Sequence, residues 1–369
     1  MLSNRYSETQ TDGFQLDKSG ILRWLRETDP SRLLELWRQA DAVRQANVGA
    51  AVHLRGLIEI SNICRRQCAY CGIRAGNAAL PRYRMPADEV LACARLADKL
   101  GYGTVVIQGG EDPGLSAEWF AGILRQIKAE TPLAITLSLG ERETGELALW
   151  RDAGADRYLL RFETSNPDLF AAIHPAAPGS LAGRLALLGH LRALGYEIGS
   201  GVMVGIPGQT YDDLAADLLL FRELDLDMIG LGPFLPHPQT PLARAAERSG
   251  GPDQPPNNEL MTYKMLALTR IMCPKANIPS TTALASLNAG AGRELGFRRG
   301  ANVVMPNLTP RPYRQLYEIY PAKARVTDDA VEFHNRMLAG IIAAGREIGC
   351  GRGDSPARLS RQNWPASHG

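Results

Sequence analysis

The sequence has little of two things that mark common functional classes, namely net charge and cysteine. Its 41 Lys and Arg residues nearly balance its 39 Asp and Glu residues, which leaves a formal net charge of +2. That balance argues against a protein that binds nucleic acid or a membrane surface through its overall charge, and it favours a small-molecule partner. Six cysteines in 369 residues are too few for a secreted disulfide scaffold.

The sequence also lacks a basic-then-apolar leader over residues 1–20, and it has no apolar run long enough to cross a bilayer. We therefore expect a cytoplasmic protein. In a reducing cytosol, clustered thiols bind metal more often than they form disulfides. Three cysteines lie within eight residues, whereas Cys93, Cys273 and Cys350 are each isolated.

Candidate strands and helices alternate from about Arg55 onward. The strands are short β-branched or apolar runs, and the stretches between them have helical period, as at 87–100, 116–129, 181–194 and 212–224. The eight candidate strands are residues 57–61, 104–108, 134–139, 157–163, 198–206, 228–234, 278–284 and 302–306. Eight βα units close a parallel barrel whose active site lies at the C-terminal strand ends. The sequence therefore predicts an α/β fold, a (βα)8 TIM-type barrel.

Helical extensions are expected on both sides of this barrel. One or two amphipathic helices are predicted over 20–50 and another over 328–348. We expect an N-terminal helical extension (1–53), the barrel (54–323), and a C-terminal helix and tail (324–369). Residues 250–258 predict an irregular loop, and the polar residues from 351 onward predict a frayed tail.

The clustered cysteines, Cys64, Cys68 and Cys71, have the spacing CxxxCxxC and directly follow the first predicted strand. Three thiolates can bind three irons of a 4Fe-4S cubane and leave the fourth iron open for a substrate. Structural zinc is the alternative, but a closed zinc site takes four ligands and His53 is poorly spaced to be one. The spacing, with Tyr70 before the last Cys, resembles that of the radical S-adenosylmethionine (SAM) superfamily.

This resemblance implies that the open iron chelates the amino and carboxylate groups of SAM, and that the Tyr70 backbone helps to fix the adenine. For the Tyr70 ring, packing within the loop is an equal alternative. The neighbouring Arg65, Arg66 and Arg74 are interpreted as a solvated basic loop, with moderation of the cluster charge as the alternative.

Polar residues also stand at the ends of the second and fourth strands. Gly110 and Glu111 resemble the "GGE" element that contacts the amino group of SAM, with an ordinary Gly-rich turn as the alternative. Strand alternation points Arg161 and Glu163 inward together. Inward charges must be paired or liganded, so we expect either a core salt bridge or, preferably, a bound zwitterion. On the sixth strand, alternation points Met228 inward.

Beyond these motifs, most of the chain resembles the family of the FeFe-hydrogenase maturase HydE. The resemblance covers about 54–323 and is carried by RYRMP, GED, TLSLGE, GADRYLLRFET, MVGIPGQT, GPFLPHPQTPLA, NIPSTTA and GANVVMPNLTPRPYRQLYEIYP. It implies contacts to SAM from Glu163, Arg184 and Met228. It implies a substrate and anion side lined by Thr136, Ser138, Arg161, Thr281 and Thr282, and a tyrosine, Tyr317, that approaches the substrate.

The resemblance has two departures. Gly109 stands where a Ser is expected, and Phe162 stands where a His is expected, which puts one polar contact near the cofactor in doubt. The second, auxiliary cluster of some relatives is expected to be absent, because residues 324–339 contain no Cys. The predicted cofactors are therefore one 4Fe-4S cluster and SAM.

The implied function is a radical SAM enzyme that cleaves SAM reductively and uses the 5′-deoxyadenosyl radical on a sulfur-ligated iron precursor in FeFe-hydrogenase maturation. Its implied partners are a small anionic iron substrate, an electron donor of the flavodoxin or ferredoxin type and other hydrogenase maturation factors, with no nucleic acid or membrane. A 3-methylornithine synthase or another biotin synthase relative is the enzymatic alternative. A non-catalytic iron–sulfur carrier is the alternative from another class, although it would have no use for a cofactor site.

Overall fold

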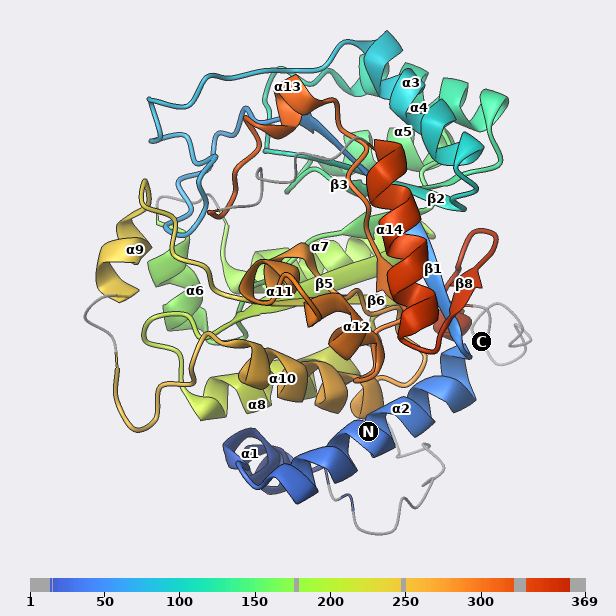
Figure 1. Cartoon of the computed structure of the whole chain (residues 1–369). Helices are drawn as coiled ribbons and strands as arrows, with labels where there is room; N and C mark the ends of the chain where they lie inside the picture. The colour runs from blue at the N-terminus through green and yellow to red at the C-terminus, as the bar shows by residue number, and fades with distance from the viewer. Residues whose placement is uncertain (1–13, 15, 176–178, 247–249, 322–329, 359–369) are drawn as a thin grey trace, which may run out of the picture.

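Seven parallel strands form one continuous ladder in the computed structural model, which describes residues 14, 16–175, 179–246, 250–321 and 330–358 (Figure 1). The ladder runs in the order β6-β5-β4-β3-β2-β1-β7, and a further strand, β8, pairs with β1. Single parallel bridges from Asn277 to Met228 and from Pro279 to Val303 connect β6 to β7 and complete the ring. The strands are β1 (Ala51–Ser61), β2 (Thr104–Gly109), β3 (Ala134–Ser138), β4 (Arg157–Leu159), β5 (Glu197–Val204), β6 (Met228–Pro233), β7 (Val303–Val304) and β8 (Glu347–Gly349). The predicted TIM-type barrel is confirmed.

Helices cover the outside of this ring and contribute their apolar faces to one large core (Figure 1). The helices are α1 (Lys18–Arg26), α2 (Pro30–Val48), α3 (Ala87–Lys99), α4 (Ala117–Glu130), α5 (Thr144–Asp152), α6 (Pro167–Ile173), α7 (Leu181–Ala193), α8 (Tyr211–Glu223), α9 (Pro241–Ala246), α10 (Glu259–Met272), α11 (Thr282–Leu287), α12 (Gly292–Phe297), α13 (Arg311–Arg314) and α14 (Ala330–Ala343). The predicted N-terminal helices are α1 and α2, which contact α8 and α10. Among the described helices, none is long and apolar enough to span a membrane.

Local signals in the sequence explain where many of these helices begin. The Thr210 hydroxyl accepts a hydrogen bond from the Asp213 N–H, and the Asp213 carboxylate accepts one from the Thr210 N–H, which forms a capping box at the start of α8. At the start of α7, the Ser180 hydroxyl accepts a single hydrogen bond from the Gly183 N–H. These caps set where α7 and α8 begin, and these helices pack against the strands that lead to the site.

Two of the predicted strands, 157–163 and 278–284, depart most from expectation. Strand β4 ends at Leu159 rather than continuing to Glu163, because Glu163 takes a left-handed backbone with φ of 66° and keeps only one bridge, to Val202. The predicted strand 278–284 is wrong beyond its first residues. Pro279 has no N–H to donate to a ladder, and the Thr281 hydroxyl caps α11, so the chain is helical from Thr282.

The end of the chain also departs from expectation. The predicted helix 328–348 is α14 followed by β8, because Gly345 leaves the helix with a positive φ of 73°. Residues 324–329 of the segment without cysteine, and 359–369 of the expected tail, lie outside the described residues. Residues 351–358 are packed against the barrel rather than frayed, and Ser355 is completely buried.

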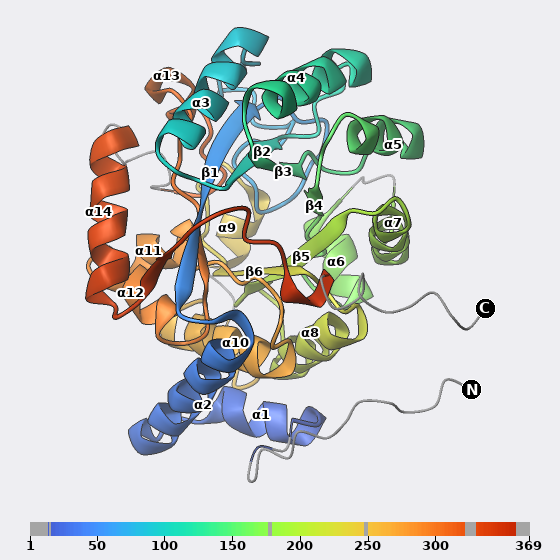
Figure 2. The same ribbon diagram turned by 90° about the vertical axis from the view of Figure 1, so that its right-hand side faces the viewer.

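Residues 349–355 close the N-terminal end of the barrel, and we call them the floor segment. Figure 2 shows the red C-terminal chain crossing in front of the strands. The fully buried Arg157 pairs with Glu197 at 2.6 Å and with Asp354 of the floor segment. Gly353 accepts a hydrogen bond from Arg55 through its carbonyl oxygen at 3.1 Å. The polar residues predicted a frayed tail, but buried arginines of the barrel bind its carboxylate and carbonyl groups.

Candidate active site

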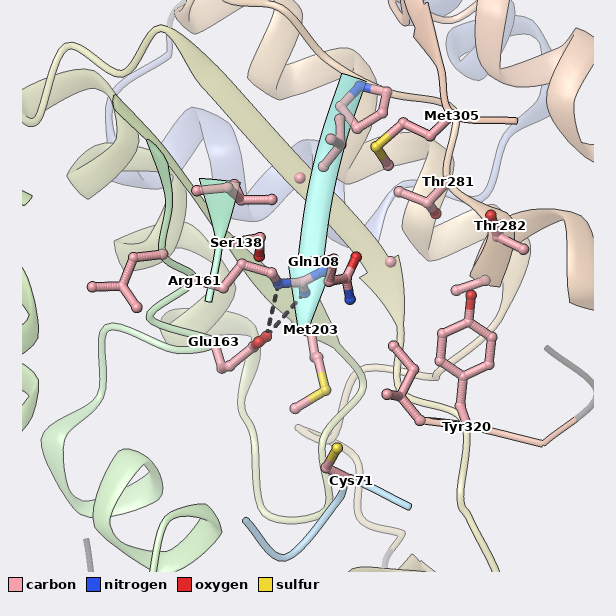
Figure 3. A pocket seen from close by; sticks show the side chains of 18 of the residues that line it. Cys71, Gln108, Ser138, Arg161, Glu163, Met203, Thr281, Thr282, Met305 and Tyr320 are labelled. Atoms are coloured by element: carbon pink, nitrogen blue, oxygen red, sulfur yellow. Dashed lines mark hydrogen bonds and ion pairs between the residues drawn. The ribbon is translucent and has the colours of Figure 1, made fainter. Parts of the chain in front are cut away.

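All the residues that the sequence predicts for the cluster, the cofactor and the substrate line one cavity of about 350 Å³ inside the barrel. A cavity of this size suits a small organic ligand. Figure 3 shows Cys71 at one end of the cavity and Met305 at the other. The predicted residues on its wall are Cys64, Cys68, Tyr70, Cys71, Gly110, Glu111, Thr136, Ser138, Arg161, Glu163, Arg184, Met228, Thr281, Thr282 and Tyr317.

The loop that carries the three cysteines follows β1 and is held by one arginine. The Arg82 guanidinium donates four hydrogen bonds of 2.6 to 3.1 Å to backbone carbonyl oxygens of this loop, those of Asn62, Ile73, Arg74 and Asn77. Charge-assisted bonds of this kind are stronger than neutral ones. Arg82, the first arginine of the RYRMP motif, therefore shapes the cysteine loop.

The same loop is joined to the segment that carries Tyr317. The Asn62 amide donates to the Leu316 carbonyl at 2.8 Å, and the Gly72 N–H donates to the Ile319 carbonyl at 3.0 Å. A side chain at Gly72 would place its Cβ only 2.1 Å from the Glu318 carbonyl oxygen, so this contact requires glycine. The thiols and the tyrosine thus belong to one connected wall.

The three thiols are free and partly buried. Burial raises the pKa of Cys68 to about 12, and the adjacent Cys64 adds to the rise; burial also raises the pKa of Cys64 and of Cys71. Within the described ranges, no three His, Cys, Asp or Glu side chains form a ready-made metal site. The donor set fits a 4Fe-4S cluster, because three free thiols share the cavity and its described lining contains neither a fourth Cys nor a His to complete a closed zinc site.

Beside the thiols, ion pairs link three elements of the site. Glu111 accepts from Arg66 at 2.5 Å and from Arg65 at 3.1 Å, and it also accepts the Glu141 N–H at 2.9 Å. Glu141 in turn joins Arg66 at 2.7 Å to Arg184 at 2.8 Å. The interpretation of a solvated loop is wrong for Arg66, which is buried, and it holds for Arg65, which is half exposed. The Glu111 carboxylate therefore faces arginines in this structure.

Gly110 serves a close approach of backbone, as its position in a glycine pair predicts. A Cβ there would lie 2.3 Å from the Ile63 carbonyl oxygen and 2.7 Å from the Cys64 Cβ. The chain that approaches is the cysteine loop itself.

Arg161 and Glu163 both face the cavity and pair with each other at 2.9 Å (Figure 3). The Arg161 guanidinium also donates to the Val202 carbonyl at 2.7 Å. The core salt bridge that the sequence left open is thus present, and it lies on the ligand-facing wall. Glu163 is one of only two described non-glycine residues with a positive φ, a conformation that costs energy and is found most often at functional sites.

Hydroxyl groups lie on more than one wall of the cavity, including the wall that carries the ion pair. The Thr136 hydroxyl is buried and has no hydrogen-bond partner among the described residues, so it is available to a ligand. Thr281 caps α11, and Tyr320 bonds to Thr282. Figure 3 shows Thr281, Thr282 and Tyr320 on one wall and Ser138 with Arg161 on another. Deeper in, Arg55 donates to the Met228 sulfur at 3.1 Å.

The two departures from the family pattern lie in different places relative to the cavity. Phe162 is fully buried and packs on the Phe221 ring, with 5.7 Å between ring centroids, and it does not line the cavity. Gly109 does line it, but a Cβ there would lie only 3.2 Å from the Leu139 side chain. Phe162 therefore leaves the cavity wall unchanged, whereas the wall at Gly109 has no side chain where the family pattern has a serine.

Several wall residues were not predicted. Gln108, Met203, Met305 and Tyr320 line the cavity, as Figure 3 shows. Gln108 and Met203 could have been found from strand alternation, because each lies near the C-terminal end of a barrel strand. Tyr320 comes from irregular chain, for which the sequence offers no periodic signal, and Met305 directly follows β7 within the predicted strand 302–306.

Comparison with known proteins agrees with this geometry. Residues 58–221 match the model of the radical SAM superfamily. The chain is 50% identical to the [FeFe] hydrogenase maturase subunit HydE of Thermotoga maritima over 85% of its own length and 86% of the relative. It is 28% identical to the 3-methylornithine synthase of Methanosarcina acetivorans, over 82% of each chain.

The solved structure of a methylornithine synthase (PylB) has the same fold, with a TM-score of 0.78, 24% identity and coverage of 95% of this chain and 97% of that one. This likeness supports the barrel and leaves the activity open. The extent and identity of the match to the Thermotoga maritima protein are decisive, and they agree with the three thiols on the cavity wall. The chain belongs to the HydE family of radical SAM enzymes.

Proposed function

We propose that this enzyme cleaves SAM reductively and uses the resulting 5′-deoxyadenosyl radical on a small, anionic, sulfur-ligated iron precursor during maturation of an FeFe hydrogenase. The observation that carries the proposal is one cavity inside the barrel that holds three free thiols at one end and unpaired donors further in. When bound there, one 4Fe-4S cluster and SAM would supply the electron and the radical.

The charge of the cavity wall supports an anionic substrate. Its described lining contains four arginines and two acids, and both acids are already paired with arginines. The arginines are Arg55, Arg66, Arg161 and Arg184. Arg66, Arg161 and Arg184 are themselves paired with acids, so Arg55 is the lining arginine without an ion pair among the described residues. In a low-dielectric interior, its positive charge favours an anion. This favours the maturase over 3-methylornithine synthase, which must hold the amino groups of lysine.

We assign the following roles. Cys64, Cys68 and Cys71 hold the cluster. The residues assigned to SAM are Tyr70, Gly110, Glu111, Glu163, Arg184 and Met228, of which Met228 lies deeper in the barrel, at the start of β6 beside Arg55. Thr136, Ser138, Thr281 and Thr282 bind the substrate, with Arg161 and Tyr317 closest to the reaction. The remaining cysteines are isolated in sequence, so we propose one cluster. The proposed partners are a flavodoxin- or ferredoxin-type electron donor and other maturation factors, and the proposed location is cytoplasmic.

The direct test is an anaerobic hydrogenase maturation mixture from which HydE has been omitted. Addition of this protein is expected to restore hydrogenase activity, and parallel incubation with lysine is expected to give no methylornithine. Without restored activity, methylornithine formation would transfer the function to the alternative synthase.

Charge changes at the cofactor end give a second test. Glu163→Gln and Arg184→Ala should each weaken SAM binding by about 10- to 100-fold, because each removes a charged hydrogen-bonding group from a buried wall. Binding is measured by calorimetry on cluster-loaded protein. Glu130→Gln and Arg95→Ala serve as controls, since they form an exposed pair between α3 and α4. Unchanged SAM binding in both site variants would contradict the assignment.

A further inference from the structure

His174 lies directly behind the cavity wall, at the C-terminal end of α6. Its side chain is buried and is not among the lining residues, but it touches two residues that are. The Tyr70 hydroxyl lies 3.1 Å from His174 Nε2, and the Arg184 Nη1 lies 3.5 Å from the same nitrogen. Tyr70 comes from the cysteine loop and Arg184 from α7, so this imidazole joins two separate elements of the wall.

The hydrogen bonds fix which nitrogen of His174 carries a proton. His174 Nδ1 lies 3.0 Å from the Phe170 carbonyl oxygen, which can only accept, so Nδ1 must donate. In the neutral ring, Nε2 is then an acceptor whose lone pair faces the Tyr70 hydroxyl and the Arg184 guanidinium. Burial, with Arg184 nearby, lowers the pKa of His174 to about 3, so the ring stays neutral at working pH.

Ring contacts also hold His174 against Tyr70 and Arg184. The His174 ring lies against the Phe170 ring, with centroids 4.3 Å apart, and meets the Tyr70 ring edge-on at 5.5 Å. The Arg184 guanidinium lies over the same Phe170 ring at 5.0 Å. The backbone adds one more contact, because the Ala69 N–H donates to the Ile173 carbonyl at 2.8 Å. The cysteine loop and Arg184 therefore both pack against the C-terminal end of α6.

We infer that His174 is a positioning residue, whose unprotonated Nε2 holds the Tyr70 hydroxyl and the Arg184 guanidinium in place for SAM. The inference rests on the proposed function, because it assumes that SAM binds at this end of the cavity. Without the imidazole, the partly buried Tyr70 hydroxyl loses this acceptor, and Arg184 is held only by its ion pair with Glu141, its hydrogen bond to the Arg161 carbonyl and its contact with the Phe170 ring. The chain itself provides the comparison needed to separate this role from ordinary packing.

The experiment measures the dissociation constant for SAM in cluster-loaded His174→Leu, His174→Gln, Tyr70→Phe and the Tyr70→Phe/His174→Leu double variant. His174→Leu is expected to weaken binding about tenfold with full cluster content. His174→Gln, whose side-chain oxygen can accept at the position of Nε2, should recover most of that loss. The double variant should bind no more weakly than His174→Leu, because both changes break one shared contact.

The matched control is His334→Leu, which removes a second partly buried tyrosine–histidine contact, between His334 Nδ1 and the Tyr102 hydroxyl at 3.1 Å, away from the cavity. It should lower the melting temperature without changing SAM binding. Binding by His174→Leu within twofold of the unsubstituted protein, additive effects in the double variant, or an equal loss in His334→Leu would each overturn the inference. If His174→Leu fails to load a cluster, recovery in His174→Gln supports the inference and equal failure overturns it. Absence of SAM binding to the unsubstituted, cluster-loaded protein would instead overturn the proposed function, and the inference with it.

Discussion

Serine at Cys64, Cys68 or Cys71 is expected to abolish loading of the 4Fe-4S cluster during anaerobic reconstitution, and SAM cleavage with it. A serine hydroxyl is a far weaker ligand for iron than a thiolate, and no fourth Cys lies on the described cavity wall to replace it. Iron and sulfide analysis with the visible absorption spectrum measures the loss.

Serine at Cys93, Cys273 or Cys350 provides the control for this experiment. Cys93 is buried against the Leu308 carbonyl and Cys350 is exposed, and none of the three is among the cavity-lining residues. These variants should load a full cluster. Loss of iron from one of them, with iron retained in the clustered cysteine variants, would contradict the assignment.

Arg157→Leu should lower the free energy of unfolding by about 3–5 kcal/mol, the cost of leaving a buried charge without its partner. The fully buried Glu197 would lose its 2.6 Å ion pair, and Asp354 would lose the anchor that holds the floor segment. Urea unfolding under anaerobic conditions, followed by circular dichroism, measures the change.

The control for Arg157→Leu is Arg95→Leu, because the Arg95–Glu130 pair at 2.7 Å has similar geometry but an exposed arginine. Removing it should cost at most about 1 kcal/mol. Equal losses in the two variants would show that the floor ion pairs contribute no more to stability than a surface pair.

The sequence predicted the fold wherever the signal was local. Strands β2, β3, β5 and β6 were predicted to within two residues at either end, because each is an apolar run followed by turn residues. Strand β1 begins six residues earlier than predicted, since its first part is paired by β7 and β8, which lie far away in sequence. Such pairing leaves no mark in the local pattern.

The site shows the same division. The cysteines, Gly110 and Glu163 were found from motif and strand position. Arg66 and His174 were not assigned a place in the site, because their importance comes from contacts with Glu141, Tyr70 and Arg184 that only the folded chain brings together. A charged loop residue is usually solvated, and a lone histidine usually has only a packing role. Here tertiary contacts place both residues beside the cavity wall.

The floor segment has a consequence for the order in which the molecule can be built. Asp354 lies 197 residues after Arg157, so at a synthesis rate of about 5–20 residues per second it follows by roughly 10–40 s. During that interval the nascent barrel holds Arg157 without one of its two carboxylates, even though Glu197 is already present. Sealing of the N-terminal end of the barrel is therefore a late event in synthesis, because the residues that complete the ring of strands are made before the floor segment.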